Sequence, residues 1–313
     1  MKTEISLSDL AASVISVPPF AVHADYSINV EANAALIQHI EEGGVSTLLY
    51  GGNANVQNWP VSAYAEWMDA LENTAAAGSL LIPSVGPDWG KMTDHAKILA
   101  SRRYPAAMLL PMSGPKSEEG LALGIRDFVQ KSGVQAIVYI KSDDYLSPQT
   151  LTELVEDGSV LSIKYAIARD DTTNDRVLGD YINAIGRERI VSGFGEPPAL
   201  VHLKHFSLAS FTAGCVCIAP TISRRFLTAL KQENYQHTEE ILKNFEPLEA
   251  LRNKADPIRV LHTAITLSGV ANMGPTLPVL TQADKSFWPQ IEQAAKQLLA
   301  VELQARKAEA ANC

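Results

Sequence analysis

Residues 134–166 read VQAIVYIKSDDYLSPQTLTELVEDGSVLSIKYA, and this stretch indicates how the whole chain is built. It contains two apolar runs, 134–140 and 160–166, with the length and composition of buried β-strands. The segment between them, 147–158, has the spacing of apolar residues that is typical of an amphipathic helix. The order strand, helix, strand predicts two parallel strands joined by a helical crossover.

The same alternation continues through the first 220 residues. Six further apolar runs lie at 11–17, 45–50, 79–85, 106–110, 189–193 and 214–219. Further helix-like segments lie at 29–44, 62–78, 93–103, 118–133 and 173–186. Several of them end in glycine, which adopts the left-handed conformation of a helix end at little cost: Gly44, Gly78, Gly133 and Gly186.

Eight such units predict a (β/α)8 barrel over residues 1–220. Residues 221–313 contain helical patterns only, so we expect the last barrel helix and a C-terminal helical extension there. A doubly wound open sheet is the alternative fold. Its dinucleotide-binding form carries GxGxxG after the first strand, whereas the first strand here ends in VPPF (17–20) and GFGEPP (193–198) lacks the third glycine.

The composition excludes several classes of partner. The chain has 313 residues, 46% hydrophobic and 19% charged, with a net charge of −9 and no block of Lys or Arg. Nucleic acid and anionic membrane surfaces are therefore poor partners. Three cysteines, Cys215, Cys217 and Cys313, form no disulfide framework, and neither a signal peptide nor a membrane span is present. We expect a cytoplasmic protein.

Two reactive side chains come at the ends of neighbouring predicted strands, Tyr139 and Lys164. In a barrel, the carboxyl ends of the strands form the active site. Desolvation there lowers the pKa of a lysine, and the neutral amine can attack a carbonyl carbon to form a Schiff base. A nearby phenol can move the protons that this chemistry requires. Alternatively, Lys164 reaches solvent or an ion pair, and Tyr139 serves packing.

A second candidate feature is the loop LYGGNANVQN (49–58), which follows the second predicted strand. Gly51 and Gly52 let the backbone approach a ligand closely, and successive N–H groups can bind a carboxylate or phosphate. Alternatively, the loop is only a tight turn. Ser84 and Ser113 also stand at strand ends, where each can hydrogen-bond a substrate hydroxyl.

In their order and spacing these features resemble the dihydrodipicolinate synthase / N-acetylneuraminate lyase family of class I aldolases, over roughly residues 10–300. VPPF (17–20) resembles the T-P-F of the family's first strand, and YGGNAN (50–55) stands in place of its G-T/S-T-G-E carboxylate loop. Tyr139 stands at the position of its strand-five tyrosine, and IKYA (163–166) resembles the block that carries its Schiff-base lysine. Residues 191–220 resemble its strand-seven to strand-eight stretch.

The resemblance implies a barrel with a helical extension that forms a homo-oligomer, a dimer or tetramer, and needs neither a cofactor nor a metal. It implies Lys164 as the imine-forming residue and Tyr139 as the proton shuttle. The backbone of residues 51–53 and the Asn53 amide would hold the carboxylate of pyruvate or another 2-keto acid. Ser113 and Val216 are the further substrate contacts that we predict.

The departures from the family pattern disfavour some of the family's activities and favour others. Gly52 and Asn53 replace the two loop hydroxyls. The segment YIKSDDYLSP (139–148) is shorter than in the synthases and lacks the arginine that binds their second substrate, which disfavours lysine biosynthesis. It looks more like the family's sugar-acid dehydratases, such as 5-dehydro-4-deoxyglucarate dehydratase, with Lys141 near their arginine. Residues 143–145 then border the substrate; alternatively they precede a helix that Ser147 and Pro148 open.

Three functions follow as hypotheses. The first is a class I lyase of the aldolase type acting on a 2-keto acid, and the second is a sugar-acid dehydratase using the same lysine imine. The third is a barrel that has lost its chemistry and serves as a binding protein. A metal-dependent class II aldolase is disfavoured, because His202 and His205 lack companion ligands and are better interpreted as a surface pair. Cys215 and Cys217 are better interpreted as core residues of a strand.

Overall fold

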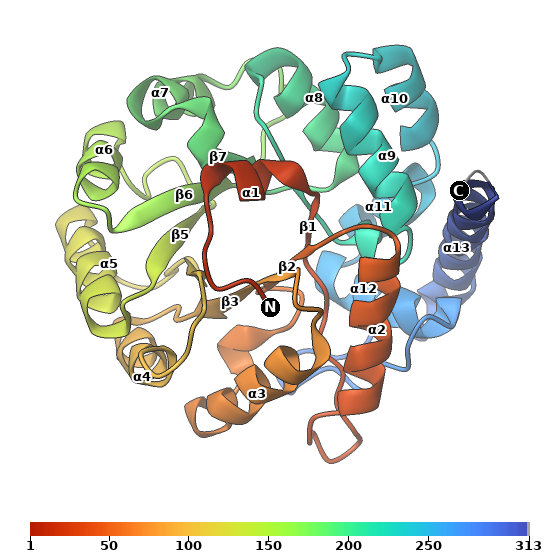
Figure 1. Ribbon diagram of the computed structural model, residues 1–313, viewed down its shortest axis with the longest axis horizontal. Helices are drawn as coiled ribbons and strands as arrows, with labels where there is room; N and C mark the ends of the chain where they lie inside the picture. The colour runs from red at the N-terminus through yellow and green to blue at the C-terminus, as the bar shows by residue number, and fades with distance from the viewer. Residues whose placement is uncertain (312–313) are drawn as a thin grey trace.

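The computed structural model describes residues 1–311, and its centre is a barrel of eight parallel strands (Figure 1). The strands are β1 (Ile15–Ser16), β2 (Thr47–Tyr50), β3 (Leu80–Val85), β4 (Ala106–Leu109), β5 (Gln135–Ile140), β6 (Val160–Tyr165), β7 (Ile190–Ser192) and β8 (Thr212–Ala213). Their order is β7-β6-β5-β4-β3-β2-β1-β8. A parallel bridge between Ser192 and Phe211 joins the two outer strands and closes the ring. The predicted (β/α)8 fold is confirmed.

A ring of helices covers the barrel, and the chain then continues as helices only (Figure 1). The helices are α1 (Leu7–Ala12), α2 (Val30–Glu42), α3 (Tyr64–Thr74), α4 (Trp89–Leu99), α5 (Glu118–Ser132), α6 (Pro148–Glu156), α7 (Arg176–Ile185), α8 (Glu196–Phe206), α9 (Pro220–Lys231), α10 (Tyr235–Leu242), α11 (Glu246–Lys254), α12 (Pro257–Ser268) and α13 (Trp288–Ala310). None of the helices within residues 1–311 combines the length and apolar character that crossing a membrane requires.

Local signals explain most helix boundaries. Ser147 caps α6, where its hydroxyl accepts a hydrogen bond from the Thr150 N–H at 3.2 Å. Gly133 ends α5 with a φ of 70°, a left-handed conformation that glycine adopts without a steric penalty. Gly78 does not end a helix, because α3 already stops at Thr74.

The fourth helix begins earlier than the apolar spacing predicts, at residue 89 instead of 93. The reason is Asp88, whose carboxylate accepts a hydrogen bond from the Lys91 N–H at 2.9 Å. This cap forms upstream of the periodic part of the helix, so the helix includes a first turn, Trp89–Met92, that the pattern of apolar residues does not reveal.

The predicted eighth strand at residues 214–219 is wrong. The strand is Thr212–Ala213, and Cys215–Cys217 form a 3-10 helix instead. All of residues 215–219 are buried, and a short run of buried apolar residues has no periodicity that separates a strand from another buried segment. Cys215 and Cys217 are core residues as expected, but they do not lie on a strand.

The N-terminal segment covers one end of the barrel. The Lys2 N–H donates to the Ser79 carbonyl at 2.8 Å, directly before β3 begins. The Ser13 hydroxyl accepts from the Ser46 N–H at 3.3 Å, directly before β2 begins. These contacts hold the segment and α1 against the amino ends of the strands, so the opposite end is the one available for a binding site (Figure 1).

The helical extension packs back onto the barrel helices. Arg224 and Arg225 of α9 both pair with Glu309 of α13, at 2.7 and 3.0 Å. Glu302 of α13 accepts hydrogen bonds from the first turn of α9, from Thr221 N–H at 3.1 Å and Ile222 N–H at 3.2 Å. α13 therefore satisfies donors at the start of α9 that have no partner within that helix. Cys313 lies outside the described residues.

Candidate active site

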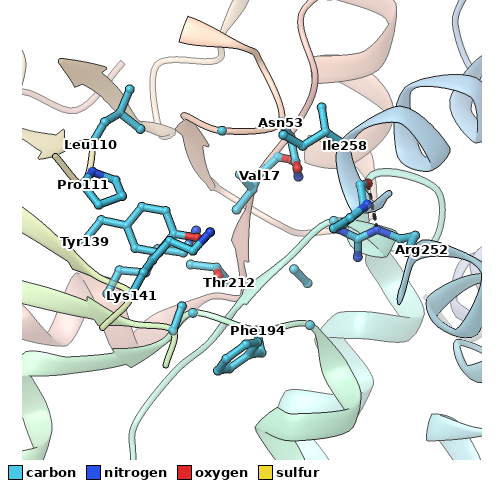
Figure 2. Close-up of a pocket in the computed structure, with 18 of the residues that line it drawn as sticks. Val17, Asn53, Leu110, Pro111, Tyr139, Lys141, Phe194, Thr212, Arg252 and Ile258 are labelled. Carbon is cyan, nitrogen blue, oxygen red and sulfur yellow. Dashed lines mark hydrogen bonds between the residues drawn. The ribbon is translucent and has the colours of Figure 1, made fainter. Parts of the chain in front are cut away.

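A cavity of about 500 Å³ opens at the carboxyl ends of the strands (Figure 2). It is lined by residues at or just after the carboxyl ends of β1 to β8 and by part of the helical extension: Val17, Gly52, Asn53, Gln57, Pro87, Leu110, Pro111, Ser113, Tyr139, Lys141, Lys164, Ala166, Gly193, Phe194, Gly195, Thr212, Ala213, Gly214, Glu249, Arg252, Asn253, Pro257 and Ile258. This is the end of the barrel where the sequence predicts the chemistry.

Lys164 is a buried lysine on β6 that faces this cavity. Its side chain is almost fully enclosed, with 5% of the residue exposed. Among residues 1–311 no hydrogen bond or ion pair compensates its charge. Burial is therefore the largest cause, and the positive charges of Lys141 and Arg252 are the smaller ones, that together lower the Lys164 pKa to about 7. With this pKa, a sizeable fraction of the Lys164 amine is uncharged near neutral pH and able to act as a nucleophile.

Tyr139 lies beside Lys164 on the neighbouring strand, because β5 and β6 pair in parallel with these two residues in register. The Lys164 Nζ is 4.4 Å from the centre of the Tyr139 ring. Burial raises the Tyr139 pKa to about 12, so the phenol keeps its proton near neutral pH. The structure thus brings the two predicted catalytic side chains together at one wall of the cavity.

Lys141 extends into the cavity from the end of β5. Its Nζ is 5.8 Å from the centre of the same Tyr139 ring, so two lysine side chains approach one phenol. Figure 2 shows Lys141 and Tyr139 pointing into the same part of the cavity. The segment after Lys141 turns away from it. Asp143 pairs with Arg169, and the Tyr145 hydroxyl accepts a hydrogen bond from the Met112 N–H at 3.1 Å.

The loop after β2 presents backbone to the cavity at Gly52 and Asn53. Within residues 1–311 the N–H groups of these two residues make no hydrogen bond, so both remain available to a ligand. The Asn53 side chain is already engaged, because its Nδ2 donates to the Val17 carbonyl at 2.7 Å. Gly51 does not line the cavity; a Cβ there would lie 2.6 Å from Met108 Cε, so its role is close packing against β4.

The two remaining predicted substrate contacts differ in location. Ser113 lines the cavity and is exposed. Val216 does not line it, because the chain around it forms a 3-10 helix in which Val216 is fully buried. Ser84 is also buried, and its hydroxyl has no hydrogen-bond partner among the described residues.

The two histidines after β7 do not form a surface pair. His202 is 1% exposed, and its Nδ1 lies 2.8 Å from the Ser192 hydroxyl, while His205 is exposed. Burial lowers the His202 pKa to about 4, so its imidazole is neutral near pH 7. Within residues 1–311 no cluster of three or more His, Cys, Asp or Glu side chains could hold a metal ion.

Sequence reasoning missed three charged residues near the cavity: Glu196 at the start of α8, and Glu249 and Arg252 of α11. All three are buried, and Arg252 pairs with Glu249 through Nη1. Burial and the negative charge of Glu249 raise the Glu196 pKa to about 8, and its Oε1 accepts a hydrogen bond from the Ser223 hydroxyl at 2.8 Å. The helix EPLEALRNK (246–254) reads as an ordinary amphipathic surface helix, so its pattern carries no signal for a buried arginine.

Comparisons with known proteins show which sequences and structures this chain is similar to. No protein-family model matches the chain. A probable 5-dehydro-4-deoxyglucarate dehydratase of Bacillus subtilis (strain 168) is 21% identical over 276 residues, covering 84% of this chain and 87% of the relative. The crystal structure of dihydrodipicolinate synthase from Bacillus clausii superimposes with a TM-score of 0.80 at 18% identity, over 94% of this chain and 99% of that one.

The N-acetylneuraminate lyase of Proteus mirabilis matches with a TM-score of 0.77 at 15% identity, over 92% of this chain and 97% of that one. The resemblance to the dihydrodipicolinate synthase / N-acetylneuraminate lyase family is thereby confirmed. At these identities the solved structures establish a shared fold.

Proposed function

We propose that this chain is a Schiff-base-forming lyase of the class I aldolase type, which acts on pyruvate or another 2-keto acid without a cofactor. The observation that carries the proposal is the pairing of Lys164 with Tyr139. A buried amine with a pKa of about 7 lies against a protonated phenol, in a cavity at the carboxyl ends of the strands. Both the nucleophile and the proton carrier that imine chemistry requires are thus present.

The first steps join enzyme and substrate. The neutral Lys164 amine attacks C2 of the keto acid, and the ketone oxygen takes a proton from the Tyr139 phenol. The Tyr139 phenolate then takes a proton from the nitrogen and passes it to the new hydroxyl, which leaves as water, so that a protonated imine remains between Nζ and C2. The backbone N–H groups of Gly52 and Asn53 are the donors we assign to the carboxylate beside the ketone, because both residues line the cavity and their N–H groups have no partner within residues 1–311.

The later steps use the imine as an electron sink. Loss of a proton or of a carbonyl fragment from C3 gives an enamine. In an aldolase, the enamine carbon is protonated and the imine is hydrolysed to release the shortened keto acid. In a dehydratase, the enamine expels hydroxide from C4 as water. Both routes need Lys164 and a group that moves protons, which we assign to Tyr139.

Dehydration of a sugar acid is the second candidate function. The Bacillus subtilis relative is named as a probable 5-dehydro-4-deoxyglucarate dehydratase. Its similarity covers 84% of this chain and supports this reaction. The presence of Lys141 at the cavity wall also supports it, because an ammonium there can bind an acidic or hydroxylated part of the substrate. The two functions share the imine and differ in the bond that breaks.

Borohydride trapping tests the proposed function. The protein is incubated with pyruvate or a longer 2-keto acid, reduced, and examined by intact mass and peptide mapping. We expect one covalent adduct on Lys164 and none in Lys164→Ala. A folded protein that yields no adduct with any keto acid contradicts the proposal and favours the binding-protein alternative, in which the barrel retains the cavity but has lost the chemistry.

We further propose the assembly that the resemblance implies, a homo-oligomer, dimer or tetramer, and the cytoplasmic location that the composition favours. We also propose that residues 1–220 act as the barrel core and 221–313 as the last barrel helix and extension. Light scattering of the purified protein tests the oligomeric state, and a single monomeric mass at micromolar concentration contradicts it.

A further inference from the structure

Arg252 is a buried arginine that the helical extension brings into the cavity. It belongs to α11, which lies beyond the last strand of the barrel, yet it lines the same cavity as Lys164 and Tyr139. Only 7% of the residue is exposed. Figure 2 shows Arg252 on the opposite side of the cavity from Tyr139 and Lys141. An arginine is rarely buried to this extent unless it is paired, and Arg252 pairs with Glu249.

The hydrogen bonds of Arg252 leave part of its guanidinium unoccupied. Nη1 donates to the Glu249 carboxylate, and Nε donates to the Pro257 carbonyl at 3.3 Å. Within residues 1–311, Nη2 donates to no protein group. A guanidinium has five N–H donors in a planar fork, so Glu249 and Pro257 hold the orientation of the group while Nη2 remains available.

Gly214, directly after β8, creates the space in which Nη2 lies. A Cβ at this position would be 2.7 Å from Nη2, closer than two such atoms can approach. The backbone of Gly214 has a φ of −91°, which other residues adopt freely, so its conformation does not require glycine. The absence of a side chain here therefore serves the close approach of the guanidinium to the strand end.

The charges around the cavity favour an anion. Its lining contains three basic side chains, Lys141, Lys164 and Arg252, and among the described residues a single carboxylate, Glu249, which Arg252 already engages. The chain as a whole has a net charge of −9. A cavity with positive walls in an acidic protein concentrates anionic ligands.

We propose that Arg252 binds an acidic group of the substrate at the end remote from the ketone, and so selects 2-keto acids that carry a second anionic group. The backbone donors of Gly52 and Asn53 already serve the carboxylate beside the ketone, which leaves the Arg252 fork for another. This inference rests on the proposed function in one respect, namely that the substrate is a 2-keto acid. The binding of the anion itself does not depend on imine formation.

A matched pair of ligands tests the proposal. 2-Oxoglutarate and 2-oxopentanoate have the same chain length and differ in ending with a carboxylate or a methyl group. Calorimetry is expected to show that the unmodified protein binds 2-oxoglutarate about 10- to 100-fold more tightly, the range expected for a charge-assisted hydrogen bond. The same measurement in Lys164→Met separates the two proposals, because it detects the preference even if no imine forms.

Two variants locate the preference at Arg252. Arg252→Gln is expected to bring the two dissociation constants to within about threefold, whereas Lys254→Gln, which removes an exposed charge from the same helix, preserves the preference. Arg252→Gln leaves Glu249 without its partner, so Gly214→Ala provides a second variant that displaces the guanidinium but keeps its charge. We expect Gly214→Ala to reduce the preference as well.

Equal binding of both ligands by the unmodified protein contradicts the proposal. So does a preference that survives in both Arg252→Gln and Gly214→Ala. A loss of binding that is equal for the two ligands assigns Arg252 to the carboxylate beside the ketone and overturns its assignment to the remote group.

Discussion

Lys164 and Tyr165 are adjacent on β6 but lie in two different regions. The polar group of Tyr165 has hydrogen-bond partners in the region around it, whereas that of Lys164 has none among the described residues. Tyr165 belongs to an outer network with Asp143, Arg169 and Asp175. Its hydroxyl donates to Asp175 at 2.6 Å and accepts from Arg169 at 3.2 Å. Lys164 faces the cavity and, among the described residues, has no group to compensate its charge. The outer network stabilises the fold, whereas the unsatisfied lysine retains a reactive amine.

The difference follows from the alternation of side chains along a strand. Successive residues point to opposite faces, so one faces the barrel interior and its neighbour faces the helices. On the outer side, Asp175 also caps α7, where its Oδ1 accepts from the Leu178 N–H at 3.1 Å. On the inner side, Lys164 lies against the Tyr139 ring, and the positive charges of Lys141 and Arg252 act on it across the cavity. The variants below perturb one region at a time.

The largest expected effect comes from breaking the outer network. Asp175→Ala removes a fully buried carboxylate, leaves Arg169 without one of its partners and removes the cap of α7. We expect a loss of about 3–5 kcal/mol in the free energy of unfolding, measured by denaturant titration. The fraction that remains folded should still form the Lys164 adduct. Asp171→Ala is the control, since Asp171 is exposed and should change stability by less than about 0.5 kcal/mol.

Tyr139→Phe tests whether the phenol beside Lys164 is chemical or structural. We expect the rate of turnover, or of imine formation, to fall about 100-fold, equivalent to about 2.7 kcal/mol, because the proton carrier is lost. Tyr165→Phe makes the same change one residue beyond the lysine but outside the cavity, and should lower stability with little effect on rate. Similar rates for Tyr139→Phe and the unmodified protein show that Tyr139 only packs.

Lys164→Met should stabilise the protein, by about 2 kcal/mol at pH 6. The folded-state pKa of Lys164 is about 7, below its ordinary value of 10.5. Below pH 7 both folded and unfolded states carry the proton, so burial of the charge has its full cost. Between pH 7 and 10.5 only the unfolded state binds the proton, so the stability of the unmodified protein rises with pH.

The advantage of Lys164→Met should therefore shrink as the pH rises through this window. Thermal denaturation at pH 6 and pH 9 measures it. If Lys164→Met is not more stable than the unmodified protein at pH 6, or if its gain in stability grows with pH, the pKa of Lys164 is not lowered in the folded state.

The smallest expected effect is the change in the Lys164 pKa when the nearby positive charge of Lys141 is removed. Lys141 is exposed at the cavity wall, and its positive charge is the second cause of the low Lys164 pKa. In Lys141→Met we expect the Lys164 pKa to rise by less than about one pH unit, because water screens part of the interaction. Labelling with trace acetic anhydride at different pH values, followed by peptide mapping, gives the midpoint. An unchanged or lower midpoint contradicts this contribution.

The sequence predicts the barrel and one wall of the cavity because both depend on local signals. Seven of the eight strands fall within the apolar runs, and Lys164 is conspicuous as a lysine in such a run. The eighth strand was misplaced, because buried residues 214–219 have no period to distinguish strand from 3-10 helix. Arg252 could not be found this way. Its burial depends on how α11 packs over Gly214, a contact between distant parts of the chain.

Competitive labelling of Lys164 in the unmodified protein tests whether this buried lysine carries a reactive amine near neutral pH. Trace acetic anhydride reacts only with uncharged amines, and a small added amine corrects for the reagent at each pH. We predict that the reactivity of Lys164 rises through a midpoint at about pH 7, the value that its burial and the charges of Lys141 and Arg252 produce. A midpoint near 10.5 would mean that Lys164 is an ordinary solvated lysine, and would contradict its assignment as the nucleophile.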